Sequence, residues 1–159
     1  MSNEALVNVE SSGTPREMGR QYGEQAREAI LANVGFDRAE AKALEKREFV
    51  DGMVRRLETI MPEVLEELRG VAEGGGVSVG ALILLNCRGG DWSPGCTSMA
   101  IRESPEGPVL GKNNDGVPDE RHFIVRVSRP SEGLSMIQVT YAGWLSGLET
   151  IALSAITVE

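Results

Sequence analysis

The spacing of hydrophobic residues changes once along the chain, near residue 95. Before this point apolar side chains recur every three or four residues, as in amphipathic helices, and after it they alternate with polar ones, as in strands. The pattern predicts a strand over residues 4–11, helices over 14–33, 37–60, 63–73 and 78–86, and strands over 97–103, 108–112, 123–127 and 134–141. We therefore predict an α+β chain whose later strands, near Cys96, Lys112, Val125 and Gln138, are antiparallel and share one sheet.

Local residue chemistry marks several of the predicted helix ends. The run Thr14-Pro15-Arg16-Glu17 fits an N-cap, a proline at the first helical position and a capping box. The run Gly74-Gly75-Gly76 ends the third helix, and Ser78 is placed to cap the short apolar helix that follows.

Two glycines and a set of glutamates leave their roles open. Gly19 and Gly23 lie one turn apart in the first predicted helix, where each costs about 1 kcal/mol relative to alanine. Either a second backbone packs closely against this face, or the fold tolerates a weak helix. The glutamates of the third predicted helix are expected on a solvated face; they are Glu63, Glu66, Glu67 and Glu73.

The composition of the chain argues against several classes of function. With 159 residues the chain is long enough for one domain with a real core, and its net charge of -8 without a basic patch argues against a nucleic-acid partner. His122 is the only histidine, and Cys87 and Cys96 form no CxxC pair, so a zinc site or a Cys-His pair is poorly supported. No metal or organic cofactor is implied. Because no signal sequence or apolar run of about 18 residues is visible, we expect a cytoplasmic protein without membrane contact.

The candidate chemistry lies where the hydrophobic period changes, at Gly95-Cys96. Pro94 disfavours the helical region for Ser93, so the approach is expected to be extended. A thiol that follows the unhindered glycine carbonyl can attack it, and water can then cut the resulting thioester. The product chain would begin with Cys96, whose α-amine titrates near about 8 and can serve as base for the thiol. The alternative is a buried cysteine that starts a strand.

Several segments of the chain resemble segments of the penicillin acyltransferase (peptidase C45-like) family of N-terminal nucleophile hydrolases, and they follow one another in the same order as in that family. The junction Gly95-Cys96-Thr97 matches the self-cleavage site of that family, and Gly111-Lys112-Asn113-Asn114-Asp115 resembles its Gly-x-Asn-x-Asp motif, with Asp115 19 residues after Cys96. The other matching segments are Gly13 to Gly19, Gln21 to Gly23, Leu68 to Gly74 and Leu84 to Arg88. The resemblance covers about residues 6–143, the front portion of such a protein.

The resemblance implies a four-layer α/β/β/α fold, made as a proenzyme, that hydrolyses or transfers acyl groups. Residues 1–95 would be a helical pro-region and residues 96–159 the start of the nucleophile-bearing part, within one combined domain. Cys96 matches the nucleophile and Gly95 the residue whose peptide bond is cut. Asp115 matches an acidic residue near the freed α-amine, where a carboxylate would orient the ammonium and tune its pKa; an Asn-Asp-Gly turn is the alternative.

The resemblance also implies substrate contacts and small-molecule partners. Lys112 stands where some relatives carry arginine, and it is either a substrate contact or a surface lysine. Asn113 would position the loop, and Thr97 follows the nucleophile; we expect both near the substrate. The substrate would be an amide or, in a transferase, an acyl-coenzyme A.

The chain departs from the family pattern in its last part. No asparagine follows Asn114, although family members supply a later asparagine to the oxyanion hole. From Gly147 onward, the run Leu148 to Ser154 replaces the expected Gly-Met-Asn-like stretch. Two functions are therefore carried forward. The first is a self-processing N-terminal cysteine hydrolase or acyltransferase acting through an acyl-Cys96 intermediate. The second is a truncated or split, catalytically incompetent chain that needs a complementing chain, a homo-oligomer or another partner.

Overall fold

The computed structural model describes residues 6–87, 96–107, 109–114, 122–146 and 149–153. The chain divides into two compact units, Met1–Arg88 with Arg121–Glu159 and Gly89–Glu120. The described parts of the larger unit form six helices and a four-stranded sheet, and the smaller unit holds a two-stranded hairpin. The helices are α1 (Pro15–Gln25), α2 (Arg27–Phe36), α3 (Ala39–Glu45), α4 (Arg47–Ile60), α5 (Pro62–Gly75) and α6 (Val79–Asn86). The strands are β1 (Val7–Gly13), β2 (Cys96–Ile101), β3 (Val109–Asn114), β4 (Phe123–Pro130), β5 (Ser135–Tyr141) and β6 (Glu149–Leu153).

The α+β prediction is confirmed, and so is the switch from helices to strands. Two predicted helices are each divided by one residue. The first breaks at Ala26 and the second at Lys46, neither of which has a side-chain cap. The backbone ladder continues across the first break, since Ala26 N–H donates to Tyr22 O at 3.0 Å and Ile30 N–H to Ala26 O at 2.9 Å. Ala26, at φ -105° and ψ 17°, leaves the helical region although it is buried, as is Ile30 in the next turn.

The prediction of one common sheet is wrong. The larger sheet has the order β1-β4-β5-β6, with β1 parallel to β4 and the other pairs antiparallel, whereas β2 and β3 pair only with each other in the described residues. Both edges of β4 are occupied, by β1 on one side and β5 on the other, so β3 does not pair with the strand that follows it in the sequence. Alternation along a sequence reveals a strand but does not identify its partner.

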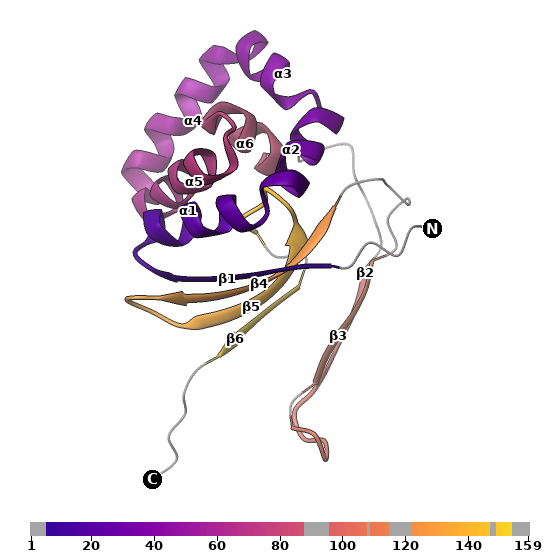
Figure 1. Cartoon of the computed structure of the whole chain (residues 1–159). Helices are drawn as coiled ribbons and strands as arrows, with labels where there is room; N and C mark the ends of the chain where they lie inside the picture. The colour runs from indigo at the N-terminus through magenta and orange to yellow at the C-terminus, as the bar shows by residue number, and fades with distance from the viewer. Residues whose placement is uncertain (1–5, 88–95, 108, 115–121, 147–148, 154–159) are drawn as a thin grey trace. The chain divides into compact units, whose positions relative to one another are not determined.

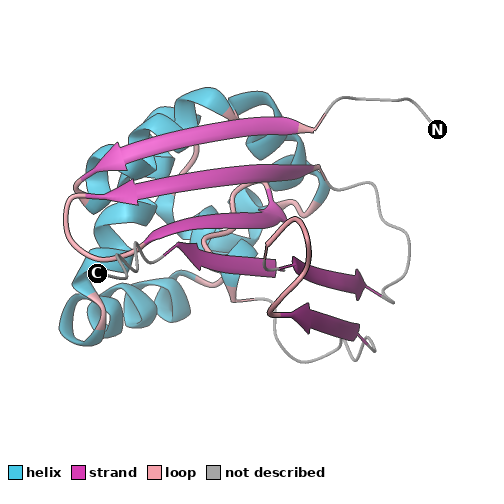
Figure 2. Ribbon diagram, turned by 90° about the horizontal axis from the view of Figure 1, so that it is seen from below, coloured by secondary structure: helices cyan, strands magenta, loops and turns pink. Residues whose placement is uncertain are grey.

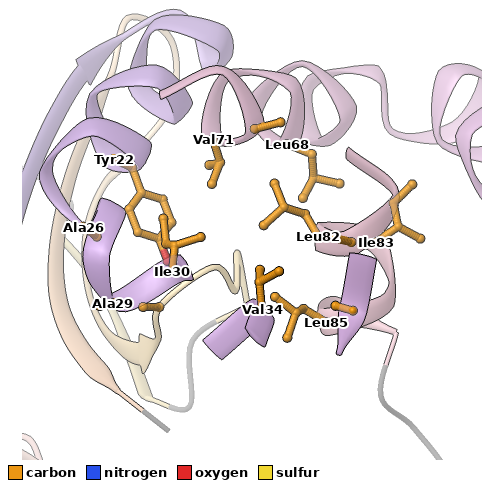
Figure 3. Packing of buried hydrophobic residues seen from close by; sticks show 14 of the residues in the cluster. Tyr22, Ala26, Ala29, Ile30, Val34, Leu68, Val71, Leu82, Ile83 and Leu85 are labelled. Atoms are coloured by element: carbon orange, nitrogen blue, oxygen red, sulfur yellow. The ribbon is translucent and has the colours of Figure 1, made fainter. Parts of the chain in front are cut away.

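The helices of the larger unit lie on one face of its sheet (Figure 1), and the strands are seen from below in Figure 2. Side chains from α1, α2, α5 and α6 point toward one another and form the apolar core (Figure 3). Its fully buried members include Tyr22, Ile30, Val71 and Leu82. Among the described residues no single helix has the length and apolar composition of a membrane span. Helices α5 and α6 taken together meet both criteria, but the chain bends by 119° between them.

The helix ends follow the predicted chemistry. Thr14 and Glu17 form the capping box of α1, with the Thr14 N–H donating to Glu17 Oε2 at 2.9 Å. This backbone hydrogen bond holds the pKa of Glu17 below its usual value. Ser78 caps α6 by accepting from Ala81 N–H at 3.0 Å, and Glu40 of α3 accepts both the N–H and the hydroxyl of Ser78. Gly76 ends α5 in the left-handed region at φ 70°.

Gly19 and Gly23 mark a close helix crossing, so the first of the two alternatives for them is correct. A Cβ built on Gly19 would overlap Glu67 O of α5, and one on Gly23 would lie 2.5 Å from Val71 O. The contact is reciprocal, because a Cβ on Gly70 would overlap Arg16 O and lie 2.7 Å from Arg20 N. Helices α1 and α5 therefore meet backbone to backbone, which only glycine permits at these positions.

We expect Gly70→Ala to destabilise the chain by about 1–3 kcal/mol, because the added methyl group meets backbone atoms that cannot rotate away. Gly52→Ala is the matched control: Gly52 lies inside α4, and apart from its own helix backbone its Cβ position is open space, so helix propensity should stabilise this variant by about 0.5–1 kcal/mol. Urea unfolding measures both. Equal, stabilising effects of the two substitutions would contradict the close crossing.

A buried ion pair joins the sheet to α5. Arg126 on β4 has 2% of its side chain exposed, and its guanidinium bonds Glu67 on α5, whose side chain is 17% exposed. The guanidinium also lies 4.9 Å from the centre of the Tyr22 ring. The expectation of a solvated glutamate face is therefore wrong for Glu67, whereas Glu66 and Glu73 pair with Arg16 at the surface.

The turn after β5 is held by three polar side chains from the helices. Tyr22 Oη accepts from Gly143 N–H at 2.7 Å and donates to Trp144 O at 3.2 Å. Asn33 Nδ2 donates to Ala142 O at 2.9 Å, and Asn86 Oδ1 accepts from Leu145 N–H at 2.9 Å. Burial raises the pKa of Tyr22 far above its ordinary value, so the hydroxyl keeps its proton and remains a donor.

Candidate active site

The candidate site lies on the β2–β3 hairpin of the smaller unit. Strand β2 begins at Cys96, as the switch in periodicity predicts, and β3 ends at Asn114. The turn falls at the predicted Pro105-Glu106-Gly107. Ser104 Oγ donates to Gly107 O at 2.6 Å and accepts from Glu106 N–H at 3.2 Å, and Gly107 takes φ 94°. Residues of this kind are the usual choice in tight turns.

The register of the hairpin determines which face each candidate residue occupies. Cys96 pairs with Asn114, Thr97 with Asn113, and Ser98 with Lys112. Directly paired residues in an antiparallel hairpin lie on the same face, and successive residues alternate between faces. Cys96, Ser98, Lys112 and Asn114 therefore share one face, and Thr97 and Asn113 share the other. Gly95 and Asp115 lie outside the described residues.

The two faces of the hairpin differ in chemistry. The face that carries Thr97 and Asn113 also holds three apolar residues that are at least 40% exposed, and these are Met99, Ile101 and Val109. The face that carries Cys96 holds a hydroxyl residue, a cation and an amide residue at the open end of the hairpin. Lys112 and Asn113 are exposed. The hairpin thus brings Lys112 to the face of Cys96 and leaves Thr97 and Asn113 on the opposite one.

Sequence reasoning missed two residues on the Cys96 face, Ser98 and Asn114. The signal was present, because the predicted turn near Pro105-Gly107 fixes which residues oppose each other once the loop length is known. The two-residue alternation then assigns every residue of both strands to a face. The expected approach of Asp115 to Cys96 remains a prediction, and the residue before Asp115 is the register partner of Cys96.

Cys87 follows α6 and is an exposed free thiol. Desolvation by neighbouring atoms raises the pKa of the Cys87 thiol, which lowers its thiolate fraction near neutral pH. In the described parts of the chain, no group of three or more His, Cys, Asp or Glu residues is arranged to hold a metal ion.

Comparison with known proteins finds distant similarity to an acyltransferase. The acyl-coenzyme A:6-aminopenicillanic-acid-acyltransferase 40 kDa form of Emericella nidulans is 26% identical over 151 residues, covering 87% of this chain and 42% of that protein. The chain therefore spans less than half the length of this relative. No protein-family model matches the chain. The identity supports a distant relationship and leaves the activity of this chain to be argued from its own residues.

Proposed function

We propose that the chain carries the nucleophile of a self-processing N-terminal cysteine hydrolase or acyltransferase. The observation that carries the proposal is the position of Cys96. It is the first residue of β2, directly after Gly95, on the hairpin face that also holds Lys112. The distant similarity to an acyltransferase that uses an acyl-coenzyme A supports the same class of chemistry.

Processing would proceed in two steps at the Gly95–Cys96 bond. The Cys96 thiolate attacks the Gly95 carbonyl carbon, the C–N bond breaks, and the α-amine takes a proton, leaving a thioester between Gly95 and the Cys96 sulfur. Water then attacks the thioester, releasing a carboxylate on Gly95 and a free thiol on Cys96. The new chain would begin with a residue that carries both nucleophile and base.

Acyl transfer would use the same two groups. The Cys96 thiolate attacks an amide or thioester carbonyl carbon, the bond to the leaving group breaks, and the α-ammonium of Cys96 protonates the departing amine of an amide or the departing thiolate of a thioester. Water or an acceptor amine then removes the acyl group from the sulfur. Asp115, one residue beyond the register partner of Cys96, would orient the ammonium and raise its pKa. The reduced thiol that this chemistry requires fits the reducing cytoplasm expected for the chain.

The other candidate residues of the hairpin lie on different faces of it. Lys112 lies on the Cys96 face, which supports a role for its ammonium in binding an anionic group of a small-molecule substrate such as an acyl-coenzyme A. Thr97 and Asn113 pair with each other on the opposite face, which favours a role in holding the strand ends over direct substrate contact.

A separate observation supports the second candidate, namely that the chain is one part of a split protein and needs a complementing chain. The sheet face away from the helices carries alternating apolar residues on paired strands, Val125 opposite Val139 and Val127 opposite Ile137. More than half of the relative has no counterpart in this chain. The occupant we propose for this face is a second sheet supplied by a complementing chain, because apolar sheet faces are stabilised by packing on another layer.

Turnover assays with chromogenic acyl amides, penicillins and acyl-coenzyme A distinguish a self-sufficient enzyme from a split protein that needs a complementing chain. We expect Cys96-dependent turnover to be weak for the chain alone, because losing one oxyanion donor typically costs about 100- to 1000-fold in rate. Under the split-protein proposal, a neighbouring-gene product should restore turnover. Robust turnover by the chain alone would reject that proposal and support a self-sufficient enzyme. Turnover that persists in Cys96→Ala would reject the nucleophile assignment.

A further inference from the structure

Three buried polar atoms of the larger unit have no hydrogen-bond partner in the part of the chain that the structure describes. They are Ser11 Oγ on β1 and both Arg126 Nε and Ser128 Oγ on β4. Each of the three residues is at most 2% exposed. Leaving a buried donor or acceptor unpaired costs its full desolvation penalty, so such atoms are nearly always bonded to protein or to ordered water. These three atoms therefore mark a place where the fold needs a further partner.

The three residues are neighbours on the sheet face that the helices cover (Figure 1). Ser11 is the register partner of Ser128, and paired strands lie about 4.8 Å apart. Both serines are buried, so their hydroxyl groups stand side by side beneath the helices. Arg126 precedes Ser128 by two residues on β4, and alternation places the two on the same face. One small molecule can therefore bridge the two hydroxyls, with Arg126 at the adjoining position.

The charges around this cluster favour a neutral ligand. Glu67 of α5 already bonds the Arg126 guanidinium, so an anion would add an unpaired buried charge, which is costly. Serine is also small, so two serines side by side leave more room between sheet and helices than the buried Val9 and Ile124 on the same strands. A water molecule fits such a place, because a buried water needs little volume and two to four polar partners.

We propose that Ser11, Ser128 and Arg126 form a binding site for one buried water molecule. The water accepts from Arg126 Nε–H and donates one hydrogen to each serine oxygen, which gives all three atoms a partner. It joins β1 to β4 through side chains in addition to their backbone ladder, and it hydrates a guanidinium whose burial is otherwise more costly. The site is independent of the chemistry proposed for Cys96, so it stands or falls separately from the proposed function.

Magnetic relaxation dispersion of the water oxygen nucleus tests the site directly, because it counts the water molecules that a protein holds in its interior. The double variant Ser11→Ala with Ser128→Ala, made in the full chain, removes two of the three proposed partners. We expect it to hold one long-lived water molecule fewer than the chain with both serines. Circular dichroism should show that the variant keeps the fold. An equal count of long-lived water molecules in the two folded proteins would overturn the proposal.

Thermal unfolding of the single variants gives a second readout, in which a bound water and an unpaired hydroxyl predict opposite signs. With the water bound, Ser11→Ala and Ser128→Ala should each lower the melting temperature by about 2–4 °C, because each removes one of its partners. The double variant should lose less than the sum, since both changes act on the same water. Ser12→Ala, at the exposed next residue of β1, is the matched control and should leave the melting temperature unchanged. If the two hydroxyls have no partner, alanine removes an unsatisfied group, and a melting temperature that stays or rises would overturn the proposal.

Discussion

With alanine in place of Cys96, we expect the chain to stay intact at residue 95, whereas the chain with its native cysteine splits into pieces of 95 and 64 residues. The substitution removes the only atom that can attack the Gly95 carbonyl from the next residue. An intact-mass spectrum of the purified chain after timed incubation measures the outcome directly. The expected effect is complete, since a methyl group has no nucleophilic capacity.

Two further variants make this result specific. Cys87→Ala should leave cleavage unchanged, because Cys87 lies eight residues before Gly95 in the sequence and desolvation raises the pKa of its thiol. Cys96→Ser should cleave, but more slowly, because a hydroxyl is a weaker nucleophile than a thiol near neutral pH. Fragments at residue 95 in Cys96→Ala would show that cleavage is done by another group or by a contaminating protease, and the self-processing proposal would fall.

Local chemistry made the helices and turns predictable from the sequence. Thr14 and Glu17 carry their capping information within four residues, and Ser78 and Gly76 likewise act on backbone groups close to them. The turn at Pro105-Glu106-Gly107 is local for the same reason. Each of these predictions needed only the residues that form the hydrogen bonds.

Features that depend on distant segments were not predictable in the same way. The pairing of β1 with β4 joins residues more than 100 positions apart, and nothing within either strand specifies the other. Arg126 shows the limit most clearly. It stands among apolar residues of β4, where alternation places Val125 and Val127 together, yet the structure buries the arginine under the helices. Its partner, Glu67, lies 59 residues away on α5.

The candidate site could be predicted from the sequence only in part. Cys96 and the strand that it begins were visible from the change of period and from the proline and glycine before it. Which residues share its face depends on the hairpin register, and that register places Lys112 on the face of Cys96 and Asn113 on the opposite face. A motif match alone treats Lys112, Asn113 and Asn114 as equivalent neighbours. The alternation of a strand separates them.

Removing Glu67 should destabilise the larger unit strongly. Glu67→Ala leaves the Arg126 guanidinium buried without its carboxylate, and breaking a buried pair typically costs about 3–5 kcal/mol. Urea unfolding measures the loss. The double variant Glu67→Leu with Arg126→Met replaces the pair by apolar side chains and should recover most of it, since such replacements are often neutral.

The exposed pair of Arg129 with Glu10 is the control for the buried one. Its atoms are 3.0 Å apart, but the two side chains are 54% and 70% exposed, so solvent screens the charges and Glu10→Ala should change stability by at most about 1 kcal/mol. The contrast tests burial, because both pairs join an arginine of β4 to a glutamate. If Glu67→Ala and Glu10→Ala cost the same, Arg126 reaches water in solution and the desolvated pair beneath α5 does not exist.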